Sequence, residues 1–274
     1  MRRKRRPIVM ILVSAGAAAA LLAAVLAGCG SSGGGSSLST TTSAPSASTL
    51  APIHGHYAPH IDPANFVSTI NNRYWPLIPG TAYHYKGVKQ AAFQVDNEVV
   101  THQKKRILGI PSTVVRDTVS EHGTPVERTF DYYAQDKQGN VWYMGELSLE
   151  RTHGKMTKAS DSWLSGVKGG KPGVIMPGNP QPGDQYRQEY YPPGQALDQA
   201  KVLSLHGSYT VPYGGKHTGL LVTSEYSPLE PQTEQKYYQP GLGEVDEHVT
   251  KGHHEEFHLV GVTNPPSSSQ LGGS

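Results

Sequence analysis

Short runs of β-branched and aromatic residues, separated by turn-forming residues, dominate the sequence beyond residue 110. The runs Thr113–Ser120, Thr124–Ala134 and Val141–Leu147 are rich in Val, Thr, Phe, Tyr and Trp, which are residues enriched in strands. Between the last two runs, the segment 136–140 has a glycine where a hairpin loop needs a positive φ angle. We therefore predict a mainly β protein built from antiparallel hairpins.

Later runs extend this pattern almost to the end of the chain. The candidates are Gln185–Tyr190, Ala200–Val211, Leu220–Tyr226, Glu234–Tyr238, Glu244–Thr250 and His254–Val262. The 31 Gly, 21 Pro and 15 Tyr among 274 residues are also more typical of a turn-rich β protein than of a helical bundle. Residues 165–183, which are rich in Gly and Pro, are expected to form a long surface connection.

One short helix is predicted near the start of the globular region. Asp62 can cap its N-terminus, and Pro63 suits its first turn. Phe66 and Ile70 would then share one face. Trp75–Pro76 would end the helix, because proline lacks the amide hydrogen that a helix interior needs.

A weak internal repeat is visible in three short matches. Residues 79–83 resemble 182–186, residues 132–133 resemble 237–238, and residues 139–141 resemble 243–245, at offsets of 103, 105 and 104. Matches in the same order at a nearly constant offset suggest two related halves, residues 72–163 and 176–262. Because sheet edges must be paired or covered, we expect the halves to share one curved antiparallel sheet or half-open barrel.

The first 29 residues have the layout of an export signal. Five basic residues at positions 2–6 precede an apolar run from Ile8 to Leu26, and the charged end of such a signal stays on the cytoplasmic side. The run ends in the sequence Leu-Ala-Gly-Cys, which resembles the lipobox of bacterial lipoproteins. This resemblance implies cleavage after Gly28 and attachment of lipid to Cys29, the single cysteine of the chain. An uncleaved transmembrane anchor is the alternative, because the apolar run could nearly span a bilayer.

Removal of residues 1–28 changes the charge of the chain. The whole chain has a formal charge of +2, but five of its 24 basic residues lie in this segment, which leaves 19 against 22 acidic residues and a charge of −3. A mildly acidic chain gives no indication of a nucleic-acid partner.

The domain boundaries follow from composition. Residues 30–50 are mostly Ser, Gly, Thr and Ala, which bury too little surface to offset the entropy of ordering. We predict a flexible tether over residues 29–56, a β domain over 57–264 and a disordered tail over 265–274.

Several blocks resemble one uncharacterised family of bacterial secreted proteins and lipoproteins. Residues 74–83 are similar to its opening block, and residues 131–146, 182–190 and 236–243 to later blocks, although Gln239 stands where Ala is expected. The resemblance spans most of residues 62–262 and implies an envelope protein, but it transfers no catalytic residue. A weaker similarity to lipoprotein carriers with a half-open β-barrel implies an apolar groove for acyl chains.

The sharpest chemical motif is His254-Glu255-Glu256-Phe257-His258, which matches H-E-x-x-H. In zinc hydrolases the two histidines lie one helical turn apart and bind the metal, while the glutamate activates water. The segments on either side have strand character, however, and no methionine follows Met176 to form a metzincin Met-turn. A zinc hydrolase is therefore the least favoured hypothesis, and we predict no catalytic residue.

The same motif in a strand gives another geometry. Alternation places His254, Glu256 and His258 on one face. A three-residue turn at 251–253 would set His248 opposite Glu256 and Asp246 opposite His258. Such a face could bind Zn²⁺ or Cu²⁺ with His248, His254, Glu256 and His258 as ligands. A solvated face whose charges pair across the strands is the alternative.

Two functional hypotheses are thus favoured over an enzyme. The first is an extracytoplasmic protein, anchored to the membrane through its N-terminal lipid, that binds or carries a small-molecule or lipidic ligand without catalysis or cofactor. The second is an envelope protein that binds metal on the face around residues 246–258. The sequence indicates neither the identity of the ligand nor the oligomeric state.

Overall fold

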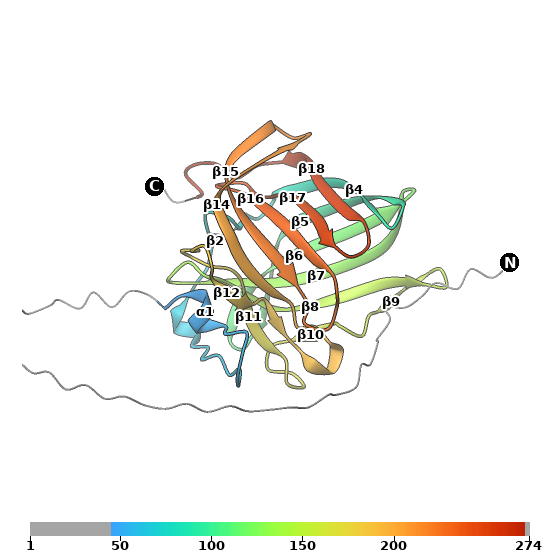
Figure 1. The fold of residues 1–274 in the computed structure, drawn as a ribbon. Helices are drawn as coiled ribbons and strands as arrows, with labels where there is room; N and C mark the ends of the chain where they lie inside the picture. The colour runs from blue at the N-terminus through green and yellow to red at the C-terminus, as the bar shows by residue number, and fades with distance from the viewer. Residues whose placement is uncertain (1–44, 272–274) are drawn as a thin grey trace, which may run out of the picture. The chain divides into compact units, whose positions relative to one another are not determined.

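The computed structural model describes residues 45–271, and most of that segment is antiparallel β structure (Figure 1). The predicted signal, Cys29 and the first part of the predicted tether lie outside the described residues. Within the described segment, no helix is long and apolar enough to cross a membrane.

The helical elements are few and short, and the strands follow one another along the chain. The helical elements are α1 (Ala47–Leu50) and two 3₁₀ turns, Pro63–Asn65 and Pro192–Gly194. The first strands are β1 (Phe66–Val67), β2 (Ile70–Asn71), β3 (Pro76–Leu77), β4 (Ala82–Lys89), β5 (Ala92–Ile107), β6 (Ile110–Glu121), β7 (Thr124–Asp136), β8 (Val141–Thr152) and β9 (Lys155–Lys158). The later strands are β10 (Trp163–Leu164), β11 (Lys171–Met176), β12 (Gln185–Arg187), β13 (Glu189–Tyr190), β14 (Gln199–Val211), β15 (Gly215–Tyr226), β16 (Thr233–Gln239), β17 (Gly243–Lys251) and β18 (Glu255–Thr263).

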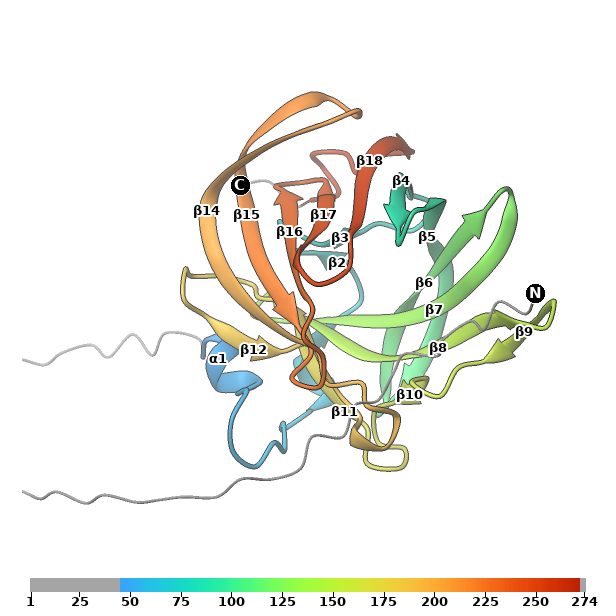
Figure 2. The ribbon, with the colours of Figure 1, turned by 45° about the vertical axis from the view of Figure 1, so that its right-hand side comes forward.

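One large sheet contains nearly all of these strands. Its order is β12-β14-β15-β16-β17-β18-β4-β5-β6-β7-β8-β11-β13, with β1 on β7 and both β9 and β10 on β8, while β2 and β3 form a separate pair. Figure 2 shows the strands from β14 round to β8 as one curved wall. The prediction of a mainly antiparallel, strongly curved sheet is therefore confirmed.

Two successive meanders form this sheet and meet where β18 pairs with β4. The first meander is β4 to β8, and the second is β12 followed by β14 to β18. The same two backbone hydrogen bonds occur in each: Gly80 N to Val100 O and Val100 N to Thr81 O in the first, Gly183 N to Val202 O and Val202 N to Asp184 O in the second.

Each meander also contains a β-bulge at an equivalent place. The register of β7 shifts between Tyr132 and Tyr133, and that of β16 shifts between Tyr237 and Tyr238. The ring of Trp75 lies between the two places, 5.8 Å from the ring of Tyr133 and 5.7 Å from that of Tyr238. These equivalences fit the predicted repeat at its offset of about 104 residues, and the relatedness of the halves stays a prediction.

The helix predicted from Asp62 is only one 3₁₀ turn. Asp62 caps it as expected, because its Oδ1 accepts a hydrogen bond from Ala64 N at 2.9 Å. Phe66 then enters β1, which pairs with β7, and its ring lies 6.4 Å from the ring of Trp142. Packing against the sheet therefore overrides the helical spacing, and the one short α-helix of the described chain is α1, further towards the N-terminus.

The folded domain begins earlier than residue 57. Ala47 and Ala51 are 2% and 0% exposed, and the Ala51 carbonyl accepts a hydrogen bond from Arg187 N. The Arg187 guanidinium donates to the carbonyls of Pro52 and Ile53. The small alanine side chains let this segment pack against β12, so the last residues of the predicted tether, 46–56, belong to the domain.

The predicted surface connection over residues 165–183 is also wrong in its middle part. Residues 171–176 form β11, which pairs with β8 and β13. Val174 and Met176 are fully buried. Burial of this short apolar run makes it a strand of the sheet, despite the glycines and prolines around it.

Candidate ligand-binding site

One face of the sheet carries an unusual number of acidic side chains. Residues directly opposite each other in an antiparallel pair share a face. Such pairs include Asp131 with Glu146, Glu127 with Glu150, Lys236 with Glu247, and Glu225 with Glu234. Burial raises the pKa of Asp96 and Glu98 on β5, and the charge of Lys236 opposes this rise although its strand, β16, is not a neighbour of β5. These side chains therefore face one another across the curve of the sheet, and we call this side the inner face.

A cavity of about 350 Å³ lies on the inner face, where the two ends of the sheet approach each other. Its volume is at the small end of the range of about 300–1,000 Å³ that is usual for ligand sites. We call it the acidic cavity. Its lining residues are Tyr143 and Glu146 of β8, Ile175 of β11, Glu189 of β13, Glu225 of β15 and Lys236 of β16, together with Asp161, Gln188, Gln195, Ala196, Asp198, Ser227 and Glu230 between strands.

The ammonium group of Lys236 is held by carboxylates on the next strand. Its Nζ lies 2.5 Å from Glu247 Oε2 and 3.7 Å from Glu244 Oε2. Burial lowers the pKa of Lys236, but the attraction of Glu244 and Glu247 outweighs it and raises the pKa well above its usual value. Burial also raises the pKa of Glu247, and Lys236 reverses this effect and holds that pKa below its usual value. This ion pair therefore stays charged.

The carboxyl groups of the acidic cavity raise one another's pKa values. Burial raises the pKa of Glu189 well above its usual value, and the charge of Asp198 adds to the effect. Burial and the charge of Glu189 do the same to Glu146. For Asp198, burial and the charges of Glu225 and Glu230 raise the pKa to about 6. Glu146 and Glu189 thus take up protons more readily than exposed carboxyl groups do.

Hydrogen bonds fix part of this lining and leave other atoms without partners. Glu189 Oε2 accepts a hydrogen bond from Trp163 Nε1 at 2.9 Å. Glu225 Oε1 accepts one from the Tyr238 hydroxyl at 2.9 Å. Gln188 Nε2 and Asp161 Oδ1 are buried and have no hydrogen-bond partner among the described residues. A buried polar atom without a partner costs free energy, so either atom would gain from a hydrogen bond to a ligand.

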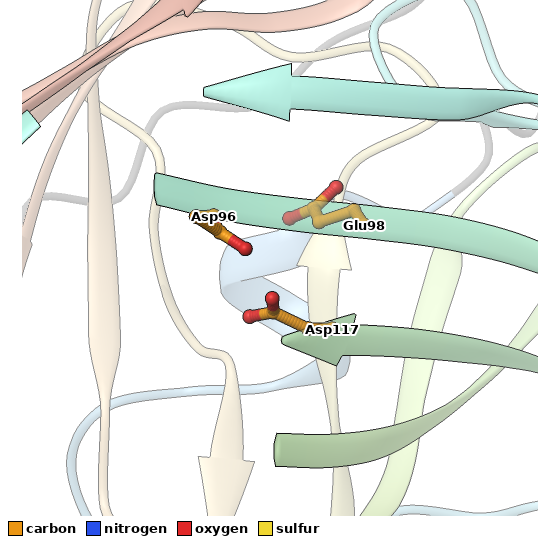
Figure 3. Close-up of side chains that lie close together, drawn as sticks. All are labelled: Asp96, Glu98 and Asp117. Atoms are coloured by element: carbon orange, nitrogen blue, oxygen red, sulfur yellow. The ribbon is translucent and has the colours of Figure 1, made fainter. Parts of the chain in front are cut away.

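A second acidic group lies further along the inner face (Figure 3). Asp96 and Glu98 of β5 and Asp117 of β6 each place a carboxylate oxygen within 4.8 Å of the others. In the described part of the chain, this is the only group of three or more acidic, histidine or cysteine side chains close enough to hold one metal ion. Oxygen ligands suit hard cations such as Ca²⁺. Burial raises the pKa of Glu98 to about 8 and that of Asp117 well above its usual value, so without a cation these groups share protons.

The H-E-x-x-H motif lies at the start of a strand. β18 begins at Glu255, so the helix that a zinc hydrolase needs is not formed, and that hypothesis is wrong. The predicted register is confirmed: Asp246 lies opposite His258, and His248 lies opposite Glu256. The β14–β15 hairpin folds over this side of the sheet, because the ring of Tyr209 stacks on the rings of His248 and His258. We call this side the histidine face.

Asp246 is the centre of the histidine face. Its side chain is fully buried and accepts hydrogen bonds from His248 Nδ1, at 2.8 Å, and from His258 Nδ1. Glu256 lies 3.9 Å from His258 Nε2 and 3.8 Å from His254 Nε2, beyond hydrogen-bond distance. The four predicted ligands are not gathered within 4.8 Å of one another. No three of them meet this distance, so a shared metal ion would require these side chains to rearrange, and His254 is 65% exposed.

Sequence reasoning missed the acidic cavity, because its carboxyl groups come from several strands and connections with no common spacing. A partial signal lay in acidic residues that share one face of a strand, Asp96 and Glu98 in β5 and Glu127 and Asp131 in β7. Acidic residues on one face of a strand are usually expected to face solvent, so this pattern gave no reason to expect a buried face.

Comparisons with known proteins add a similarity in fold alone. No family model and no curated protein matches the chain. A crystal structure from Bacteroides fragilis, of a protein described as exported and as having a YmcC-like fold, matches with a TM-score of 0.40 and 10% identity, over 70% of this chain and 100% of that one. A protein of Parabacteroides distasonis described as a lipoprotein matches with a TM-score of 0.34 and 10% identity, over 70% of this chain and 99% of that one. At these scores neither match carries an argument about function.

Proposed function

We propose that this chain is a lipid-anchored, extracytoplasmic binding protein that holds a small polar ligand in the acidic cavity and catalyses no reaction. The export signal and Cys29 support the location and the anchor. The observation that carries the binding function is the cavity itself, about 350 Å³ in volume, with two buried polar atoms that lack partners. Concave sites with a few convergent polar groups and perturbed pKa values are the usual sites of small ligands.

The lining favours a polar ligand over an acyl chain. Ile175 and Ala196 are its only aliphatic side chains, and six of the other lining residues are carboxylic acids. An acyl chain would gain little apolar contact there, and it would cover ionisable groups without offering them hydrogen bonds. The lipidic form of the carrier hypothesis thus has less support than the small-molecule form.

Native mass spectrometry of the full chain, purified from its own envelope, tests the proposal. The variant Ser227→Phe places a large ring in the cavity lining, and Ser269→Phe places the same ring at an exposed position as a control. We expect wild type and Ser269→Phe to retain a small molecule in addition to the N-terminal lipid, and Ser227→Phe to lose it. If wild type carries no such molecule, or if Ser227→Phe retains it, the proposal is wrong.

Metal binding at the histidine face is the second candidate function. It is favoured by the two hydrogen bonds to Asp246, because metal-binding histidines usually donate the other ring N–H to a carboxylate. This arrangement leaves Nε2 of His248 and His258 for a metal. Calorimetry with Zn²⁺ tests it: His258→Ala should abolish binding, and His153→Ala, in the turn between β8 and β9, should not. Binding unchanged in His258→Ala would contradict the proposal.

A further inference from the structure

The acidic cavity has an excess of negative over positive groups. Six carboxyl groups line it, from Glu146, Asp161, Glu189, Asp198, Glu225 and Glu230, against the single ammonium of Lys236. That ammonium is held by Glu247 and Glu244, which do not line the cavity. Its charge also acts on Glu225 and Asp198, but one ammonium group shared in this way does not balance six carboxyl groups.

The spacing of these carboxyl groups does not suit a bare metal ion. One metal ion needs its ligand atoms within a few ångströms of one another, since its bonds to oxygen are about 2.0–2.6 Å long. No three of the six acids bring their oxygen atoms within 4.8 Å of one another, whereas Asp96, Glu98 and Asp117 do. A larger cation, with its charge on one group and other atoms to fill the volume, fits the cavity better.

The two unpartnered atoms indicate what else the ligand carries. Asp161 Oδ1 is an acceptor, and an ammonium group offers three N–H donors. Gln188 Nε2 is a donor, and Gln188 is only 3% exposed, so water does not readily satisfy it. A ligand that satisfies both atoms needs an ammonium group and a neutral oxygen acceptor.

We propose that the acidic cavity binds a small amino alcohol, that is, an organic cation with a primary ammonium group and at least one hydroxyl oxygen. The inference rests on the proposed function and names its ligand class. The ammonium group lies among the carboxyl groups of Asp161, Glu189 and Asp198, and the hydroxyl oxygen accepts a hydrogen bond from Gln188 Nε2.

Proton release is a further consequence of this arrangement. An ammonium group beside Glu189 and Asp198 favours their ionised forms and lowers pKa values that burial raises in the empty cavity. Binding at pH 6, where part of Asp198 is protonated, therefore releases protons. The affinity falls as the pH is lowered from 7 to 5, because protons then compete with the ligand.

Isothermal titration calorimetry of the full chain in detergent tests the inference with matched pairs of probes. Each amino alcohol is compared with the compound that has a hydroxyl in place of the amine: ethanolamine with ethylene glycol, 4-amino-1-butanol with 1,4-butanediol, and glucosamine with glucose. We expect saturable binding of at least one amino alcohol, at least tenfold tighter than its partner, since a charge-assisted hydrogen bond is worth about a factor of ten or more. Titrations at pH 6 in two buffers with different heats of ionisation should show proton release.

Two variants locate the site. Asp198→Asn removes one charge of the cavity with little change of shape and should weaken binding at least tenfold. Glu256→Gln, on the histidine face, makes the same kind of change elsewhere and should leave affinity within twofold. Thermal unfolding of each variant checks that it folds, and Asp161→Asn replaces Asp198→Asn if the latter does not.

The outcomes separate this inference from the proposed function. Equal affinity for an amino alcohol and its hydroxyl partner, or unchanged binding in Asp198→Asn, overturns the inference and leaves a polar ligand site. If no amino alcohol binds while native mass spectrometry finds a neutral or anionic molecule, only the inference is wrong. If no amino alcohol binds and no molecule is found, both are wrong.

Discussion

Replacement of Lys236 by methionine is the most informative change that the inner face offers. Its ammonium is the group that keeps Glu247 ionised, and its side chain is only 21% exposed. Methionine has a similar length and no charge, so Lys236→Met removes the ion pair with little change in packing. The carboxyl groups of Glu244 and Glu247, 16% and 17% exposed, then lose their counter-charge.

The expected loss of stability follows from this burial. Removing one partner of a buried ion pair costs roughly 3–5 kcal/mol, because the remaining charge is left uncompensated. The residual exposure of the three side chains allows some screening, so we expect about 3 kcal/mol at pH 7. The loss should be smaller at pH 5 than at pH 8, because carboxyl groups without Lys236 take up protons more readily at the lower pH.

Urea unfolding of the full chain, followed by circular dichroism, measures the effect. The matched control is Lys155→Met. Lys155 is exposed on β9, so its removal should change stability by only about 0.5 kcal/mol or less. Equal losses in the two variants, or a loss in Lys236→Met that does not depend on pH, would refute the reasoning that the inner face is a buried, acidic surface.

Three further predictions concern the inner face and the join between the two meanders. Stability should fall as pH rises from 5 to 8, because burial raises the pKa of Asp131 to about 6 and that of Glu98 to about 8, above their values of about 4 in an unfolded chain. At a pH between the unfolded and folded pKa values, the folded state binds more protons than the unfolded chain. This stabilisation is complete below pH 4 and is lost as the pH rises through 6 and 8. A rise in stability over that window in urea titrations would contradict the prediction. Asp131→Asn, which keeps an acceptor for the Tyr143 hydroxyl, should flatten the pH dependence of stability between pH 5 and 6.5. An unchanged slope in that range would contradict this prediction. Gly87→Ala should lower stability by about 1–3 kcal/mol in thermal melts, because its Cβ would lie 1.9 Å from the Glu256 carbonyl oxygen on the adjacent strand, and an unaltered melting temperature would disprove that contact.

Local patterns predicted the strands and some of their pairing. The alternation around His254 and the short turn before it were enough to predict the register of β17 and β18, because both depend on a few consecutive residues. The cap at Asp62 was also readable, since it involves only Ala64. The helix expected after it was not formed, because Phe66 packs on a strand 70 residues later in the chain.

The features that the sequence did not predict depend on contacts between residues far apart in the chain. Alanines at 47 and 51 gave no sign of burial, because their partner Arg187 lies far along the chain. The acidic cavity depends on how far the sheet curls, which brings Glu146 of β8 and Glu225 of β15 into one lining. Strand pattern predicted a curved sheet, but it gave no measure of that curvature.

The most direct test of the acidic cavity as a ligand site is a crystal structure of the full chain, purified from its own envelope with no ligand added. We predict electron density for a small molecule within hydrogen-bond distance of Gln188 Nε2 and of the carboxyl groups around Asp198. Electron density for ordered water alone, throughout the acidic cavity, would contradict this prediction.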